Sequence, residues 1–192
     1  MEQTSYPLQR KWAIWEMWNL NTDSAPSSSK NLSSIGEFDN LHYFWQHWNY
    51  IPHANPAMLF ENPETKVKVI IESLNQSIEA IGLFESGVEP LWEDPVNKAG
   101  SDFFFEVDSF EFNKIKEVWD RIVFSLIGET LVYSEDIAGC RVVDRKKVYR
   151  FEIWAKFDGQ LSKHSAKSLQ IKESIKKITG NNEINIASHS TY

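Results

Sequence analysis

The order of two kinds of apolar pattern constrains the fold of this chain more than any other feature. Two long runs, 110–127 and 161–178, repeat apolar residues at helical spacing, and Gly128 and Gly180 follow them as helix-ending residues do. Short segments with alternating apolar residues stand before, between and after these runs, as strands do. Strands separated by long helices predict an α+β domain. In it, a curved, mainly antiparallel β-sheet carries long helices on its convex face and leaves its concave side for a ligand.

The remaining elements follow from the same patterns. Asp39 is placed as the N-cap of a further helix, in which apolar and aromatic residues recur at helical spacing from Leu41 to Trp48. The polar, Ser-rich stretch 19–33 predicts a flexible loop, and 64–74 is compatible with either a helix or a strand. We expect strands at 12–18, 34–38, 77–84, 103–107, 138–143, 148–155 and 184–187.

Length and composition favour one globular domain, 1–192, that works inside the cell. Its eight Trp and twelve Phe must be either buried or used in binding. The single Cys140 excludes an internal disulfide framework, and residues 1–10 lack the apolar run of a signal peptide. No stretch is long and apolar enough to span a membrane. We therefore expect a cytoplasmic monomer without membrane contact.

The charge balance argues against a general binder of nucleic-acid backbone. The net charge is −7, yet positions 141–177 hold eleven Lys and Arg against four Asp and Glu. A local basic segment on an acidic chain favours a ligand with a few concentrated phosphates over a long duplex. The alternative is that these charges belong to solvated helix and strand faces.

Trp92 and Glu93 form the most specific binding motif, on the Pro-containing segment 87–94. A Trp ring stacks on a base, and it stacks more strongly on a cationic one. The neighbouring carboxylate accepts two parallel N–H bonds, which guanine offers and adenine does not. A methylated, cationic guanine therefore satisfies both residues. The alternative is a packed Trp beside a solvated Glu.

The motif belongs to a resemblance that covers roughly positions 6–155. Leu83-Phe84-Glu85-Ser86-Gly87-Val88-Glu89-Pro90-Leu91-Trp92-Glu93-Asp94, followed by Asn97-Lys98, resembles the signature of the eukaryotic translation initiation factor 4E family, the proteins that bind the mRNA cap. Further blocks in the same order are 6–15, 38–45, 119–129 and 139–154. Relative to the family, about 53–76 is expected to be an insertion.

The resemblance implies a site for the 7-methylguanine of the cap. Trp92 matches one of the two rings that enclose the base, Glu93 matches the carboxylate that recognises guanine, and Trp154 matches a residue that touches the N7-methyl group. The position of the other ring falls in 27–31, which has no aromatic residue. Trp18 is therefore the candidate for that ring, with a core position as its alternative.

For the cap phosphates, the resemblance implies contacts from Arg145 and Arg150, with Lys147 as an auxiliary. Residues 145 and 150 differ in parity, so a turn or bulge must bring them to one side. Without the resemblance, Arg145 to Lys147 reads as a solvated turn.

The resemblance also implies a second surface, which receives a Tyr-x-x-x-x-Leu-hydrophobic helix from a scaffold protein like initiation factor 4G or from a 4E-binding repressor. Asp120 and Arg121 depart from the family, which places an apolar residue and then an acid there. Arg121 would repel the partner's basic residue. The positions that keep the character of the family's groove are Pro7, Leu41, Trp45, Ile127 and Glu129.

Catalysis is not expected. The chain has no Gly-rich phosphate loop, no H-E-x-x-H and no G-x-S-x-G. His42 and His47 are five apart, which does not align them as metal ligands. We expect a cap-binding initiation factor without cofactor or metal. Two alternatives remain: a divergent member with weak cap binding that acts as a translational repressor or competitor, and an enzyme that acts on a nucleotide.

Overall fold

One seven-stranded antiparallel sheet organises the chain. The computed structural model describes residues 6–18, 31–62, 64–71, 76–159 and 165–189. The strand order is β2-β1-β3-β5-β6-β4-β7, and all neighbouring pairs are antiparallel. The strands are β1 (Pro7–Trp18), β2 (Leu32–Asn40), β3 (Ile78–Glu85), β4 (Ser101–Asp108), β5 (Ile137–Asp144), β6 (Val148–Ala155) and β7 (Asn185–Ser188).

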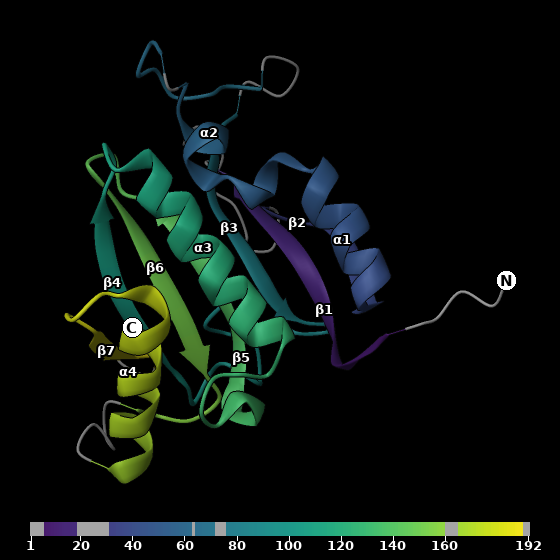
Figure 1. The fold of residues 1–192 in the computed structure, drawn as a ribbon, viewed down its shortest axis with the longest axis vertical. Coiled ribbons are helices and arrows are strands. Elements are labelled where there is room, and N and C mark those ends of the chain that lie inside the picture. The colour runs from purple at the N-terminus through teal and green to yellow at the C-terminus, as the bar shows by residue number, and fades with distance from the viewer. Residues whose placement is uncertain (1–5, 19–30, 63, 72–75, 160–164, 190–192) are drawn as a thin grey trace, which may run out of the picture.

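The long helices cover one face of this sheet. Figure 1 shows α3 crossing in front of the strands, with α1 on one side and α4 on the other. The arrangement confirms the predicted α+β class. The helices are α1 (Leu41–Tyr50), α2 (Pro56–Phe60), α3 (Phe112–Ile127) and α4 (Ala166–Thr179), and the short 3-10 helices are η2 (Pro52–Ala54) and η3 (Ser134–Asp136).

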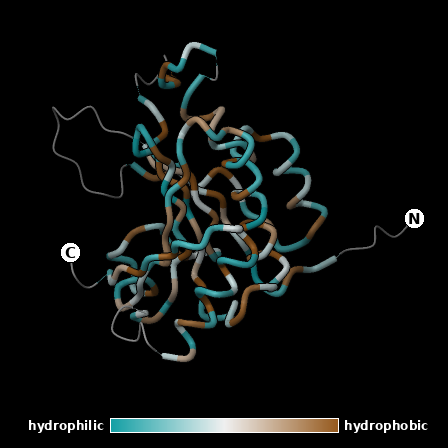
Figure 2. Tube along the Cα trace, turned by 60° about the vertical axis from the view of Figure 1, so that its left-hand side comes forward, coloured by the Kyte–Doolittle hydropathy of each residue, from teal (hydrophilic) through white to brown (hydrophobic). Residues whose placement is uncertain are grey.

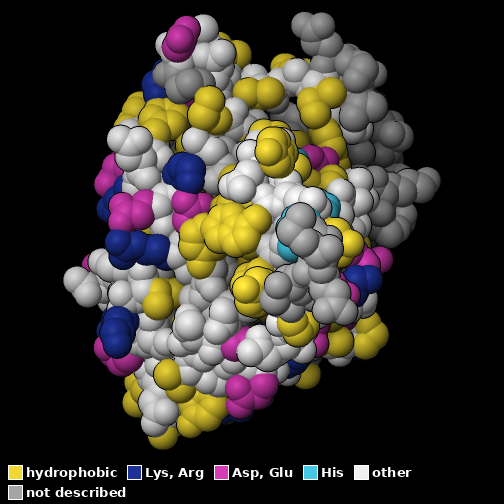
Figure 3. Space-filling view, turned by 45° about the vertical axis from the view of Figure 1, so that its right-hand side comes forward, with side chains coloured by type: hydrophobic (Ala, Val, Ile, Leu, Met, Phe, Trp, Pro, Cys, Tyr) yellow, Lys and Arg dark blue, Asp and Glu magenta, His cyan; other side chains and the backbone are white. Residues whose placement is uncertain are grey.

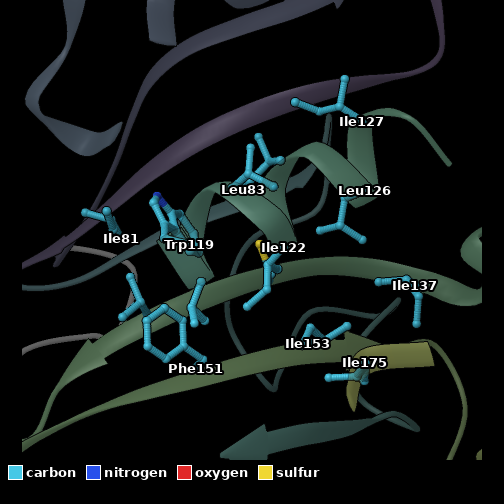
Figure 4. Packing of buried hydrophobic residues seen from close by; sticks show 14 of the residues in the cluster. Ile81, Leu83, Trp119, Ile122, Leu126, Ile127, Ile137, Phe151, Ile153 and Ile175 are labelled. Carbon is cyan, nitrogen blue, oxygen red and sulfur yellow. The ribbon is translucent and has the colours of Figure 1, made fainter. Parts of the chain in front are cut away.

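The main core lies between the helices and the sheet. Figure 4 shows Trp119, Ile122 and Leu126 of α3 among side chains of the strands, including Phe151 and Ile153 of β6. In Figure 2 hydrophobic segments recur along the strands at the centre of the molecule. The alternation of the strands sends every second residue into this core, so the residues between them face the opposite, open side of the sheet.

Several element boundaries differ from the prediction because a neighbouring residue forms the cap. Asn40, not Asp39, caps α1, and its side chain accepts a hydrogen bond from the backbone N–H of Tyr43. Ser165 caps α4, so that helix begins at Ala166 instead of 161. At the end of α3, Gly128 is the C-cap as predicted, and the residue after it, Glu129, has a left-handed φ of 51°.

The two atypical segments are described only in part. The predicted loop 19–33 ends earlier, because β2 begins at Leu32. Its residues 19–30 lie outside the described part of the chain. The segment expected to be an insertion, 53–76, contains α2, and the described part of 64–74 forms neither a helix nor a strand, only isolated bridges. None of the described helices combines the length and apolar content that a membrane span requires.

Candidate functional site on the open face

Aromatic residues gather on the open face of the sheet. Phe84 of β3, Val88 and Trp154 of β6 form a buried cluster, against which Trp15 and Trp92 pack. The Phe84 and Trp154 rings meet edge to face, with centroids 5.3 Å apart. Such a geometry suits the quadrupoles of two aromatic rings. This open-face cluster is separate from the main core, so the sheet carries apolar side chains on both sides.

A braced turn after β3 carries Trp92 to this cluster. The side chain of Asn97, which is fully buried, donates a hydrogen bond of 2.8 Å to the carbonyl of Glu89. The Asp94 carboxylate accepts another, of 3.0 Å, from the Glu89 N–H. These bonds fix the loop that holds Trp92 half-buried and Glu93 exposed to solvent. The motif therefore presents a ring and a carboxylate side by side on a rigid support.

His189, a residue that the prediction missed, lies beside both Trp92 and Trp154. Its ring stacks on Trp92 with centroids 6.2 Å apart at 24°, and its centroid is 4.4 Å from that of Trp154. Its Nδ1 lies 2.8 Å from the Asn97 carbonyl oxygen, which can only accept, so Nδ1 carries a proton. Burial lowers the pKa of His189. A neutral imidazole therefore backs Trp92.

A buried ionic network runs beside the cluster. Glu152 of β6 accepts hydrogen bonds from Arg141 Nε at 2.5 Å and from Trp154 Nε1 at 2.9 Å. Arg150 Nη2 lies 2.7 Å from Asp102 Oδ2, and Arg150 Nε lies 2.9 Å from Glu152 Oε1. The two carboxylate side chains are only 4% and 2% exposed. Because each arginine touches at least one of them, the four charges cancel within the network.

The two carboxyls of the network differ in their pKa shifts. Burial, and then the charge of Glu152, raises the pKa of Asp102 despite its bond to Arg150. Burial also acts to raise the pKa of Glu152, but Arg141 and Arg150 outweigh it, so that pKa is lowered. Sequence offered a signal for Glu152, which lies on its strand between the apolar Phe151 and Ile153, but not for Asp102, which follows Ser101.

The predicted guanine-binding residues are brought together except for one. Trp92, Glu93 and Trp154 share the open-face site, although Trp154 is fully buried. Trp18 is half-buried and packs against the main core. It has the same parity on β1 as the core residues Trp12 and Ile14, whereas Trp15, which was not predicted, has the opposite parity and joins the open-face cluster.

The predicted phosphate-binding residues divide between a turn and a strand. Arg145 and Lys147 are exposed on the turn between β5 and β6, where Lys146 adopts a left-handed φ of 72°. The structure records no ion pair for either of them with another described residue. Arg150 lies within β6, opposite Val143 of β5 and Glu106 of β4. Phosphate contact by these three residues stays a prediction.

The predicted partner residues differ in their exposure and contacts. Pro7, Leu41 and Trp45 are exposed, whereas Ile127 is buried. Glu129 is committed to other side chains of the chain: it accepts hydrogen bonds from Arg10 Nε at 2.7 Å and from Ser134 Oγ at 2.6 Å.

An aromatic residue of α3 that the prediction missed extends the surface around Trp45. Phe124 is 39% exposed, and its centroid lies 5.4 Å from that of the Trp45 ring, which is 42% exposed. Figure 3, which turns the α1 side of the molecule forward, shows hydrophobic side chains gathered at the centre of this face with charged ones beside them. We call Leu41, Trp45 and Phe124 the α1 patch.

The two residues that depart from the family are occupied within α3 and its neighbours. Asp120 accepts a hydrogen bond of 3.2 Å from Trp48 Nε1 and pairs with Lys116. Arg121 pairs with Glu117 and donates to the carbonyl of Ile178 at 3.2 Å. The charge of Arg121 is thus partly balanced by a neighbour four residues earlier.

Comparison with protein families gives one match over nearly the whole chain. The family model described as "Eukaryotic initiation factor 4E" matches residues 7–191. Similar curated proteins include eukaryotic translation initiation factor 4E of Bos taurus, 30% identical over 151 residues, which are 78% of this chain and 60% of that protein. The factor of Xenopus laevis is 29% identical over 151 residues, 78% of this chain and 61% of that protein. The matched part of the chain thus spans only about three fifths of the length of these two relatives.

Solved structures share the fold. The complex of C. elegans eIF4E-3 with the 4E-binding protein Mextli and cap analog superposes with a TM-score of 0.75 at 20% identity, covering 98% of this chain and 95% of that one. Ascaris suum eIF4E-3 with m2,2,7G cap gives a TM-score of 0.74 at 22% identity, covering 98% and 94%. At this identity the likeness bears on the fold alone.

Proposed function

Because the chain belongs to the eukaryotic initiation factor 4E family, we propose that it binds the 7-methylguanosine cap of mRNA in the cytoplasm, without catalysis, and serves translation initiation. The observation that carries the proposal is the pairing of a half-buried Trp92 with an exposed Glu93 on the braced turn. Two solved structures with this fold contain a cap or cap analog, which supports the choice of ligand.

In this proposal each site residue has a separate role. Trp92 stacks on the cationic base, with His189 behind it, and Glu93 accepts the two N–H bonds of the guanine edge. Trp154 contributes to the wall near the N7-methyl group. Arg145 and Lys147 meet the phosphates from the turn.

A stacking partner on the other side of the base is the weak point of the site. Trp18 packs on the main core, so it reaches the ligand only if the end of β1 rearranges. This observation favours a second candidate function, a family member with weak cap binding that acts as a translational repressor or competitor. One missing ring leaves about 1 to 3 kcal/mol of stacking unmade.

The α1 patch supports a protein partner. We propose that it receives an amphipathic helix of a scaffold protein like initiation factor 4G, or of a 4E-binding repressor, as a helix lies in an apolar groove. One structure with this fold contains the 4E-binding protein Mextli. Pro7 lies next to the patch, because the N–H of Leu41 bonds to the carbonyl of Tyr6.

Two matched Trp substitutions separate the two surfaces. Tryptophan fluorescence is titrated with 7-methyl-GTP and with GTP, and binding of a Tyr-x-x-x-x-Leu-hydrophobic peptide is measured in parallel. Trp92→Ala should lose at least about 1 to 3 kcal/mol of affinity for 7-methyl-GTP, and its affinity for the peptide should be unchanged. Trp45→Ala should do the reverse, and circular dichroism should be unchanged in both. Equal affinity of the wild type for GTP and 7-methyl-GTP would contradict cap binding.

A further inference from the structure

Arg150, which stands on the open face beside the proposed cap site, is enclosed by acidic side chains. Asp102 binds its Nη2, Glu152 lies against its Nε, and Glu106 stands opposite it on β4. The guanidinium carbon also lies 3.6 Å from the centroid of the Phe104 ring. Both an edge and a face of the guanidinium are therefore in contact with the protein.

The enclosure reduces what Arg150 can offer to a phosphate. A phosphate oxygen gains from an arginine through a charge-assisted hydrogen bond and through the local positive potential. Here Asp102 already takes one of the strong bonds, and the carboxylates of Asp102 and Glu152 cancel the charges of Arg150 and Arg141. Glu106 adds a further negative charge on the same face.

We propose that Asp102 sets the phosphate preference of the cap site by retaining Arg150, so that Arg150 adds little to the affinity for the phosphates of a 7-methylguanine nucleotide. This inference rests on the proposed function. The exposed Arg145 and Lys147 of the neighbouring turn supply what phosphate contact remains. Asp102 is therefore a specificity-determining residue, and its neutralisation releases Arg150 for a phosphate.

Dissociation constants of 7-methylguanosine, 7-methyl-GMP and 7-methyl-GTP test this in four proteins: the wild type, Asp102→Asn, Arg150→Ala and the double variant. The preference for 7-methyl-GTP is the ratio of the dissociation constant of 7-methylguanosine to that of 7-methyl-GTP. Relative to the wild type, Arg150→Ala should change this ratio by less than about threefold. Asp102→Asn should widen that preference about tenfold, as expected for one hydrogen bond to a charged group. The double variant should lose this gain.

Glu106→Gln is the matched control, because it removes a negative charge from the same strand and face without freeing a bond of Arg150. It should widen the preference less than Asp102→Asn does. If thermal unfolding shows that Asp102→Asn is not folded, Asp102→Ser takes its place. The same gain in preference for 7-methyl-GTP is expected from it.

Three outcomes would overturn the inference. The first is a loss of 7-methyl-GTP affinity of about tenfold or more from Arg150→Ala alone, with 7-methylguanosine unaffected, because Arg150 would then already bind phosphate. The second is an equal gain from Glu106→Gln and Asp102→Asn. In both of these outcomes the protein still binds cap analogues, so the proposed function stands. The third, failure of the wild type to bind any of the three ligands, removes the proposed function as well.

Discussion

Replacing Glu152 by Gln should destabilise the protein more than any other single substitution of a charged residue on the open face. The Glu152 side chain is 2% exposed and contacts Arg141, Arg150 and Trp154. Gln keeps the shape of Glu but removes its charge, which leaves Arg141 without its carboxylate partner and Arg150 with Asp102 alone. Breaking a buried ion pair on one side costs roughly 3 to 5 kcal/mol.

Urea unfolding at pH 7, followed by tryptophan fluorescence, measures this loss. With a denaturant slope of about 2 kcal/mol/M, the midpoint should fall by roughly 1.5 to 2.5 M. Glu106→Gln is the control, because Glu106 is exposed and no ion pair joins it to another described residue. Its effect should stay within about 0.5 kcal/mol.

The same prediction has a pH dependence with a defined sign. The pKa of Glu152 is lowered below 4.5 in the folded protein, so its charge stabilises the fold fully above that value and progressively less as the pH falls towards the folded pKa. The stability difference between the wild type and Glu152→Gln should therefore shrink below pH 4.5. A difference under about 1 kcal/mol at pH 7, or one that grows on acidification, would refute the reasoning.

Three further substitutions test separate parts of the structure. Trp18→Ala should cost roughly 2 to 3 kcal/mol of folding stability, less than a fully buried Trp, and leave cap affinity unchanged; a selective loss of cap affinity would make Trp18 a stacking ring after all. His189→Gln should flatten the fall in stability that we expect in the wild type as the pH drops through 6.5. Burial lowers the pKa of His189 in the folded protein, so the unfolded chain takes up the proton first. An unchanged pH profile would contradict a buried neutral imidazole. Arg145→Ala should weaken binding of 7-methyl-GTP more than that of 7-methyl-GMP and flatten its salt dependence, whereas equal losses would argue against phosphate contact.

The fold could be predicted because its elements follow local periodicities. Period-two segments became the strands and the run 110–127 became α3, since each pattern suits one packing geometry only. Boundaries were less determined where two capping residues adjoin, as Asp39 and Asn40 do, because both side chains can accept the same backbone N–H bonds. The pairing register of β2 with β1, which extends to Asn40, then decides which of the two residues caps the helix.

From its residues alone the candidate site could be predicted only where they are neighbours in sequence, and Trp154 was added through the resemblance to the family. Trp92 and Glu93 form a local motif, whereas His189 and Asp102 reach it through the strand order β6-β4-β7, which no local pattern specifies. Trp18 is instructive in another way. Its parity with Trp12 on β1 already indicated the core face, and the resemblance to the family outweighed that signal.

Counting charges along the chain overestimated the free positive charge near the site, because a count does not include partners from distant segments. The basic surplus of 141–177 suggested phosphate binding, but partners for these cations come from distant acids that sequence counting ignores. Lys156 pairs with Glu85, Lys167 with Asp136, and Arg150 with Asp102. The exposed turn from Arg145 to Lys147 is where the surplus can still act on a ligand of the open face. On the proposed function, we therefore expect recognition of the base and recognition of the phosphates to be separable, because the hydrogen bonds recorded for the turn that carries Trp92 and Glu93 do not involve Arg150.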